Sequence, residues 1–316
     1  MLDGRDLRSN LIVARGPIQV TLRNLQIKNT QEAANTAPES SPALVLISDE
    51  ASVRFDGCGI EGSIGNGVAL AGKASAVFAN CTLSKNRGYG INVSSASKVE
   101  VSQTKIRENG RSGIALMNVD TAVTLASGTE VEANSNHGVE VANGAELKGS
   151  GVTLRGNQKV GVIVDGSNSL ARLDSSCVIS ANRKYGIGVL NAGKVLLSDS
   201  AVEDNSEGGL YAKTGAQVEI LGCHFIANGP LGASLMDKPS KLSIAKTEFK
   251  SHSSLATAFE QGRGTVTECT FLNNDTAIYF GDGASGSASG NTSHLGPLED
   301  IKDALVKDSN GEVIRK

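Results

Sequence analysis

A short pattern recurs along this chain of 316 residues at intervals of 21 to 25 residues. Each copy reads Asn, three residues, Gly and then an alternating apolar stretch, as in NRGYGINV at 86–93 and NRKYGIGV at 182–189. A repeat of this length over eleven copies predicts a solenoid, because each copy can bury its apolar face only against its neighbours. The glycine position of the pattern is held by Gly67, Gly90, Gly113, Gly138, Gly161, Gly186, Gly209 and Gly232, and Ala43, Ala256 and Ala277 extend the series.

Within each copy the apolar residues alternate with period two, which is typical of β-strands. Ile91 and Val93 follow one glycine, Val99 and Val101 form a second pair, and Leu83 precedes that glycine by seven residues. Each copy therefore holds three short strands joined by turns, and none carries a helical pattern. The sequence predicts an all-β fold, a parallel β-helix of about 11–12 coils that stack ~4.8 Å apart.

The composition agrees with coils that have a narrow interior and tight corners. Aromatic residues make up 3% of the chain, Trp is absent, and Gly numbers 37 against 6 Pro. Because aromatic side chains bury the most area each, we expect a core built from Val, Ile, Leu and Ala. The excess of glycine over its usual share of ~7% is explained by a tight corner in every coil.

The asparagines of the repeat fall at one turn position, where Asn tolerates left-handed backbone angles. Stacked in register, their amides are expected to hydrogen-bond to one another along the axis. Ser63 and His252 take this position in two copies. The asparagines predicted to form this ladder are Asn86, Asn109, Asn134, Asn157, Asn182, Asn205, Asn228 and Asn273.

The five cysteines share another position, eight or nine residues before the glycine position, where other copies carry Thr, Ser or Val. This predicts a small inward-facing slot in which the thiols are buried as hydrophobic groups, and no metal site. Cys58 and Cys81 lie in adjacent coils and are the one pair that could form a disulfide. The full set is Cys58, Cys81, Cys177, Cys223 and Cys269.

The β-helix domain is expected to span residues 1–290, with a polar insertion at Thr30–Pro42. A tail follows at 291–316. There Leu298, Ile301 and Leu305 have helical spacing, with acidic residues in the first turn. We expect a C-terminal helix that caps the open end of the solenoid, or alternatively one that binds a partner.

The charge is nearly balanced, with 30 Lys and Arg against 33 Asp and Glu, a formal net charge of −3. This argues against partners such as nucleic acid or an anionic membrane. No motif for a nucleotide, a metal or a serine nucleophile is present, so no cofactor is expected. The first residues lack the apolar region of a secretory signal, and the cysteine number is odd. These features favour a cytoplasmic location and a chain that is part of a larger protein.

The NxxxGIxV repeats resemble the right-handed parallel β-helix repeat family, the pectate-lyase-like superfold, over roughly residues 40–280. The resemblance implies right-handed coils. It also implies a choice of functions, because the family includes pectate lyases, polygalacturonases, alginate epimerases and phage tailspikes beside non-catalytic binding modules. The motif is specific for the fold and not for an activity.

The outward position two residues after each glycine carries a single carboxylate, Glu140. It therefore lacks the paired acids of a glycosidase and the clustered acids of a calcium site. The main functional hypothesis is a non-catalytic module that binds a carbohydrate or a protein. The alternative is a polysaccharide-active enzyme, a uronate lyase, hydrolase or epimerase.

The candidate ligand-binding residues lie at the turn just before the glycine. Aromatic rings there could stack on sugars, and basic groups could attract acidic ones. The ordinary alternative is that solvated turns carry long polar side chains. The predicted stripe consists of Tyr89, His137, Tyr185, Arg87, Arg111, Lys159, Arg183 and Lys184.

Overall fold

The computed structural model describes residues 1–3, 10–29, 43–294, 300–301, 306–307 and 313–314. It divides into two compact units, residues 1–159 (unit 1) and 160–316 (unit 2). All regular elements in the described residues are β-strands, and they recur in the order sheet A, sheet B, sheet C. The predicted right-handed parallel β-helix, with three strands per coil and about 12 coils, is confirmed.

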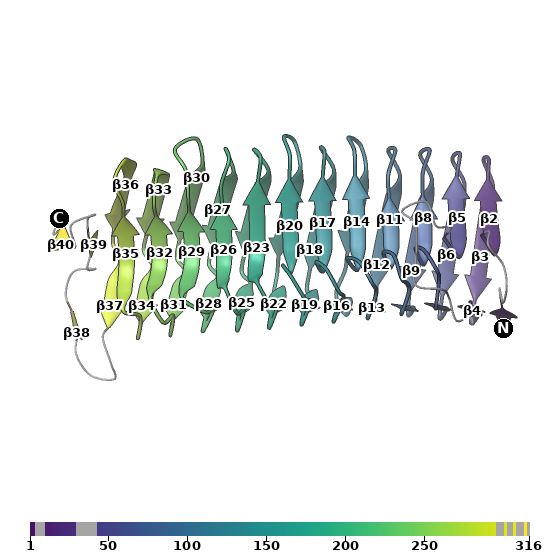
Figure 1. Ribbon diagram of the computed structural model, residues 1–316, viewed down its shortest axis with the longest axis horizontal. Helices are drawn as coiled ribbons and strands as arrows, with labels where there is room; N and C mark the ends of the chain where they lie inside the picture. The colour runs from purple at the N-terminus through teal and green to yellow at the C-terminus, as the bar shows by residue number, and fades with distance from the viewer. Residues whose placement is uncertain (4–9, 30–42, 295–299, 302–305, 308–312, 315–316) are drawn as a thin grey trace. The chain divides into compact units, whose positions relative to one another are not determined.

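Unit 1 forms its coils from strands that pair in parallel with the strand one coil away. Figure 1 shows β5, β8, β11 and β14 side by side in this way. Sheet A contains β1 (Leu2–Asp3), β4 (Gln26–Lys28), β7 (Gly59–Glu61), β10 (Thr82–Ser84), β13 (Lys105–Arg107), β16 (Glu130–Glu132) and β19 (Thr153–Arg155). Sheet B contains β2 (Ile12–Arg15), β5 (Val45–Ser48), β8 (Val68–Leu70), β11 (Ile91–Val93), β14 (Ile114–Met117) and β17 (Val139–Ala142). Sheet C contains β3 (Gln19–Arg23), β6 (Ser52–Asp56), β9 (Ser75–Ala79), β12 (Lys98–Ser102), β15 (Ala122–Leu125) and β18 (Glu146–Ser150).

Unit 2 repeats the same arrangement (Figure 1). Sheet A contains β22 (Val178–Ser180), β25 (Ala201–Glu203), β28 (His224–Ile226), β31 (Glu248–Lys250), β34 (Thr270–Leu272), β37 (Thr292–His294) and β38 (Asp300–Ile301). Sheet B contains β20 (Val162–Asp165), β23 (Tyr185–Leu190), β26 (Gly208–Ala212), β29 (Leu231–Leu235), β32 (Leu255–Phe259), β35 (Thr276–Phe280), β39 (Val306–Lys307) and β40 (Val313–Ile314). Sheet C contains β21 (Leu170–Asp174), β24 (Lys194–Ser198), β27 (Gln217–Leu221), β30 (Lys241–Ala245), β33 (Gly262–Thr267) and β36 (Ala284–Ser289).

The core follows from the period-two pattern. In β11 the side chains of Ile91 and Val93 are fully buried, whereas Asn92 between them faces outward. Ile91 pairs with Ile114 of the next coil, and Val93 pairs with Leu116. Like residues therefore stack on like residues along the axis, which gives a continuous aliphatic core.

The expectation of a core without aromatics is wrong in one respect. Six of the seven phenylalanines are fully buried, and several stack on one another between coils. Phe55 and Phe78 lie 4.7 Å apart between ring centroids with planes at 3°. Phe249 lies between Phe225 and Phe271, at 5.0 and 5.4 Å. The phenylalanines of the chain are thus concentrated at positions where one ring can lie flat on the next.

The predicted asparagine ladder is present in both units. In unit 1 the Asn86 amide donates to Asn109 Oδ1 at 2.9 Å, and in unit 2 the Asn182 amide donates to Asn205 Oδ1 at 2.9 Å. The same oxygen also accepts the backbone N–H of the preceding asparagine, at 3.2 and 3.0 Å. These side chains are almost fully buried, so each amide satisfies backbone groups that water cannot reach.

Two details of the ladder differ from the prediction. The left-handed backbone angle belongs to the residue before each ladder asparagine, such as Lys85 (φ 55°) or Ala181 (φ 53°), and not to the asparagine itself. The last ladder residue is Asn274 rather than Asn273. Ladder residues stand three positions after the buried residue of sheet A, and the turn after Asn274 is one residue shorter than the others. Counting four residues back from Ala277 therefore gives Asn273, whereas the ladder residue is Asn274.

His252 interrupts the ladder of unit 2. It is buried, its Nδ1 lies 2.9 Å from Asn274 Oδ1, and its Nε2 has no hydrogen-bond partner among the described residues. Burial lowers the pKa of the His252 imidazole, and the hydrogen bond with Asn274 offsets this only in part. Burial therefore favours the neutral form of the His252 ring in the folded chain.

This pKa shift predicts that acid destabilises unit 2. Because the folded pKa lies below the unfolded one, the stabilisation is complete above the usual histidine value of about 6.5 and is lost as the pH falls through the folded pKa. The difference in unfolding free energy between wild type and the His252→Asn variant, measured by urea denaturation from pH 8 to about pH 5, should shrink or reverse on acidification. If the difference in unfolding free energy between the two proteins does not vary with pH, the inference that burial lowers the pKa of His252 is wrong.

The cysteine slot is confirmed as an inward-facing position. All five cysteines are buried and free, so the disulfide considered for Cys58 and Cys81 does not form. Burial raises the pKa of the Cys81 and Cys223 thiols to about 11. The Cys81 thiol donates to the Ala79 carbonyl at 3.1 Å. These groups therefore act as buried apolar side chains rather than as reactive thiols.

At the C-terminus the expected helix is not seen in the described residues. Asp300–Ile301 forms β38 and pairs antiparallel with β37, and Val306–Lys307 forms β39 and pairs with β35. The last strands of a solenoid expose unpaired N–H and C=O groups, and added strands satisfy these directly. Leu298 and Leu305 lie outside the described residues, as does the Thr30–Pro42 insertion. The domain boundary near residue 290 stays a prediction.

Candidate functional site

The structure brings part of the predicted stripe together at the start of sheet B in unit 1. Tyr89, Ser112 and His137 occupy the same position in three successive coils, because each stands two residues before the residues Ile91, Ile114 and Val139, which are paired in register. Tyr89 and His137 are half-buried, whereas Arg111 is exposed. The rings of Tyr89 and His137 therefore stand two coils apart.

Polar contacts link these coils. The Arg111 guanidinium lies 5.4 Å from the centroid of the Tyr89 ring, a cation–π distance. Ser112 is buried, donates to Glu140 Oε2 at 3.1 Å and accepts from the Asn136 amide at 3.3 Å. Arg111 thus packs on the Tyr89 ring, and Glu140 accepts a hydrogen bond from Ser112. These contacts argue that much of this cluster stabilises the turns between coils.

The remaining basic residues of the stripe in unit 1 are exposed at turns. Arg87 and Lys159 present their side chains to solvent. The backbone N–H of Lys159 donates to Asn136 O at 3.0 Å, so it lies one coil beyond the Asn136 turn. Their role in binding stays a prediction.

In unit 2 the stripe residues Lys184 and Tyr185 contact side chains of the next coil, which the sequence did not indicate. Tyr185 lies against Tyr211 of the next coil, with ring centroids 4.5 Å apart and planes at 55°. Lys184 pairs with Glu207 at 3.4 Å, and Arg183 is exposed beside it. Burial raises the pKa of both tyrosine hydroxyls, and the negative charge of Glu207 adds to this effect.

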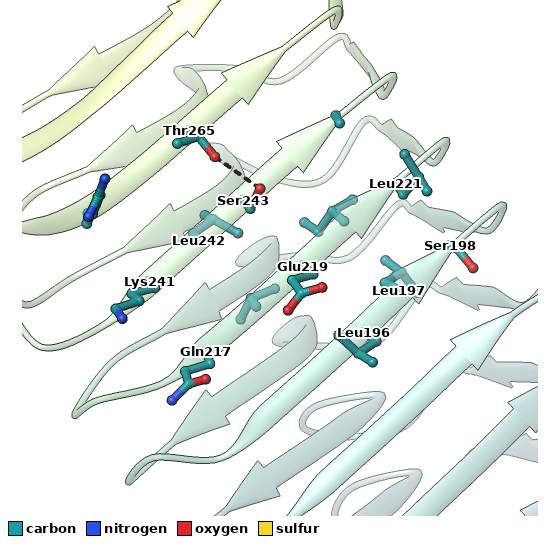
Figure 2. A pocket seen from close by; sticks show the side chains of 14 residues that line it. Leu196, Leu197, Ser198, Gln217, Glu219, Leu221, Lys241, Leu242, Ser243 and Thr265 are labelled. Carbon is teal, nitrogen blue, oxygen red and sulfur yellow. Dashed lines mark hydrogen bonds between the residues drawn. The ribbon is translucent and has the colours of Figure 1, made fainter.

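A groove that the sequence analysis missed lies on the outer face of sheet C in unit 2. It covers β24, β27, β30 and β33, with a volume of about 700 Å³ (Figure 2). Figure 2 shows Gln217, Glu219, Lys241 and Ser243 on the exposed side of these strands. The outward lining residues include Leu196, Ser198, Gln217, Glu219, Leu221, Lys241, Ser243, Arg263 and Thr265.

The charged side chains of this groove are arranged in rows across its strands. Lys194, Gln217, Lys241 and Arg263 are paired in register, so they form one row across four strands. Glu219 stands in the next row and is paired with Lys194 at 3.2 Å. Thr265 donates to Ser243 Oγ at 3.0 Å beside it. Of the described residues that line the groove, one is a carboxylate and two are cations, with Lys194 at its edge.

The signal for this face was present in the sequence. Lys194, Leu196 and Ser198 alternate with the buried Val195 and Leu197, and the positions of Lys194 and Leu196 carry charged or polar residues in the next three coils. The outward position two residues after each glycine lies on sheet B, whereas the groove lies on sheet C. Periodicity alone separates inward from outward positions but does not show which outward face is hollow.

Neither a metal cluster nor a membrane span is found in the described part of the chain. Its His, Cys, Asp and Glu side chains form no group of three or more that could hold a metal ion. Its secondary structure also includes no helix long and apolar enough to cross a lipid bilayer.

Several solved structures share the fold. A periplasmic alginate epimerase, AlgG, superposes with a TM-score of 0.68 at 10% identity, over 90% of this chain and 76% of that chain. The A-module of the mannuronan C-5 epimerase AlgE6 from Azotobacter vinelandii gives 0.64 at 13% identity, over 89% and 92%. The pectate lyase Pel9A gives 0.51 at 12% identity, over 87% and 80%. No curated protein sequence matches the chain.

The sequence itself also matches a family model, described as the right-handed β-helix region. The matches span residues 11–175 and 137–294, which together cover nearly all the coils described above. By its repeat, its coil architecture and these matches, the chain belongs to the right-handed β-helix family.

Proposed function

We propose that the protein acts on an acidic polysaccharide, a polymer of uronate sugars, which it holds in the sheet C groove of unit 2. The observation that carries this proposal is the row of Lys194, Lys241 and Arg263 across the groove. Neighbouring strands lie ~4.8 Å apart, so the row presents positive charge repeatedly along one line. A polyuronate presents carboxylates repeatedly along its length, and charge-assisted hydrogen bonds to such groups are strong.

The residue set of the groove favours one kind of chemistry. A glycosidase needs two carboxylates that flank the scissile bond, and the groove lining has Glu219 alone. Removal of the proton at C5 of a uronate needs one base and cations that stabilise the negative charge on the sugar carboxylate. In the proposed site Glu219 takes the proton, and Lys241 and Arg263 face the carboxylate.

The step balances in either of two outcomes. In a lyase the electron pair released at C5 forms a C4–C5 double bond, and the glycosidic oxygen at C4 leaves with a proton. In an epimerase the C5–H bond breaks, water delivers a proton to the opposite face of C5, and the glycosidic bonds of the polymer stay intact. The solved structures of similar fold are named as alginate epimerases and a pectate lyase. Their names support an enzyme over the non-catalytic module that the sequence analysis preferred.

A binding experiment tests the substrate class. The double variant Lys241→Ala with Arg263→Ala should bind alginate and polygalacturonate about tenfold more weakly than wild type, as expected for the loss of charge-assisted bonds. The matched control is Lys250→Ala, an exposed lysine on the outer face of sheet A, which should leave affinity unchanged. Equal affinity of all three proteins, measured by calorimetry, would overturn the groove as the site.

A second experiment tests turnover. Incubation of each polymer in deuterated water, followed by NMR, detects proton removal at C5 whether the product is unsaturated or epimerised. Glu219→Gln should reduce the rate about a hundredfold or more, as is typical for loss of a general base, while binding is retained. The control is Glu203→Gln on sheet A. Binding by wild type with neither deuterium exchange at C5 nor an unsaturated product would leave the chain as a binding module and refute the catalytic proposal.

A further inference from the structure

A second surface of unit 2 has a construction of its own. Tyr185 in β23 is paired in register with Gly208 in β26, and Tyr211 in β26 is paired with Gly188 in β23. Each tyrosine thus stands opposite a glycine of the neighbouring strand. The two half-buried rings meet at 4.5 Å, and we call them the tyrosine platform.

The glycines are required for the rings to lie where they do. A Cβ at Gly188 would stand 2.7 Å from Tyr211 Cε1, and a Cβ at Gly208 would stand 2.7 Å from Tyr185 Cε1. Both distances are shorter than van der Waals contact, so any other residue at these positions would displace the rings. Such packing of aromatic side chains onto strand glycines covers the backbone, and here it also leaves two ring surfaces on the outer face of sheet B.

Polar groups surround the tyrosine platform with nearly balanced charge. Lys184 and Glu207 form an ion pair at 3.4 Å, and the Asn191 amide donates to Asp165 Oδ1 at 2.7 Å. The charges of Glu207 and Asp165 both act on the Tyr211 hydroxyl and help to raise its pKa. Hydrogen-bonding carboxylates and an amide therefore lie near the rings.

We infer that the tyrosine platform is a second carbohydrate site and that it binds the pyranose units of a neutral polysaccharide. A pyranose has an apolar C–H face, which packs on aromatic rings, and a rim of hydroxyls, which the surrounding carboxylates and amide can accept and donate to. Arg183 and Lys184 balance the charges of Glu207 and Asp165, so this surface has no excess of positive charge to attract a polyuronate, in contrast to the sheet C groove. The site lies on sheet B rather than sheet C, and it does not depend on the proposed activity.

Calorimetry with cellohexaose, mannohexaose and an acidic oligogalacturonate tests the inference. Tyr185→Ala and Tyr211→Ala should each weaken binding of a neutral oligosaccharide about tenfold, the loss expected for one stacked ring. Tyr211→Phe keeps the ring and should stay within about threefold, since only one hydroxyl contact is lost. Gly188→Ala leaves both tyrosines in the chain but lifts Tyr211, so it should also weaken binding.

Two control variants show whether a loss of affinity is specific to the tyrosine platform, and not due to a general change in sheet B or to the sheet C groove. Tyr279→Ala removes an outward tyrosine of the same sheet that lies outside the platform, and Lys241→Ala with Arg263→Ala alters only the groove. Neither should change the affinity for a neutral oligosaccharide. The inference is overturned if no neutral oligosaccharide binds wild type, if Tyr279→Ala weakens binding as much as Tyr211→Ala, or if the platform variants change the unfolding midpoint alone.

Discussion

Replacement of Asn205 with alanine is expected to destabilise unit 2 by about 3–5 kcal/mol. The Asn205 side chain is fully buried and makes four ladder and backbone contacts. Its Oδ1 accepts from the backbone and side chain of Asn182, at 3.0 and 2.9 Å. Its amide donates to Ile179 O at 3.0 Å and to Asn228 Oδ1 at 2.8 Å. Alanine removes these bonds and leaves buried donors that water cannot reach.

The measurement is equilibrium urea unfolding followed by circular dichroism. Ser206→Ala, an exposed change at the next residue of the same turn, is the control and should lie within about 0.5 kcal/mol of wild type. A loss below about 1 kcal/mol for Asn205→Ala would mean that the ladder contributes little net stability.

Replacement of Phe249 with alanine is expected to cost about 3–5 kcal/mol, because it opens a cavity in the middle of a stack. The Phe249 ring is fully buried between Phe225 and Phe271, and the His252 ring lies 6.0 Å away. Neighbouring coils are held by their strand pairing, so they cannot move together to fill the space.

The companion variant Phe249→Leu keeps most of the volume and should cost about 1.5 kcal/mol or less. Urea unfolding of the two variants separates the volume of the side chain from its aromatic character. Equal losses for leucine and alanine would show that ring stacking, and not cavity formation, determines the effect.

The sequence was sufficient to predict the coil, because the repeat fixes which residues stack. Period-two alternation placed Ile91 and Val93 inside, and the shared position of the asparagines predicted the ladder. The left-handed angle was assigned to the wrong residue, since a repeated asparagine is prominent in a sequence whereas the varied residues before it, such as Lys85 and Ala181, are not.

The candidate sites were predicted less well. Tyr185 was recognised at its turn, but its contact with Tyr211 depends on Gly188 and Gly208, which in the sequence look like ordinary members of a glycine-rich repeat. The groove around Lys241 depends on how far neighbouring side chains stand out from sheet C, and spacing does not contain that information. The catalytic or binding character of either surface cannot be read from periodicity.

The ladder turn also limits how this chain can change its length. From β7 to β32 the interval from the buried residue of sheet A to that of sheet B is eight residues, as from Leu83 to Ile91 and from Phe225 to Ala233, and the turn after Asn274 is one residue shorter. Within this run the longer copies, such as the one between Gly113 and Gly138, carry their extra residues at the other corners, whereas Thr30–Pro42 stands between β4 and β5, before the first ladder asparagine. Where the asparagine ladder runs, from Asn86 to Asn274, insertions and engineered loops are therefore expected to be tolerated at the other corners or as whole added coils, whereas a residue inserted at the ladder turn would shift the amides out of reach of one another.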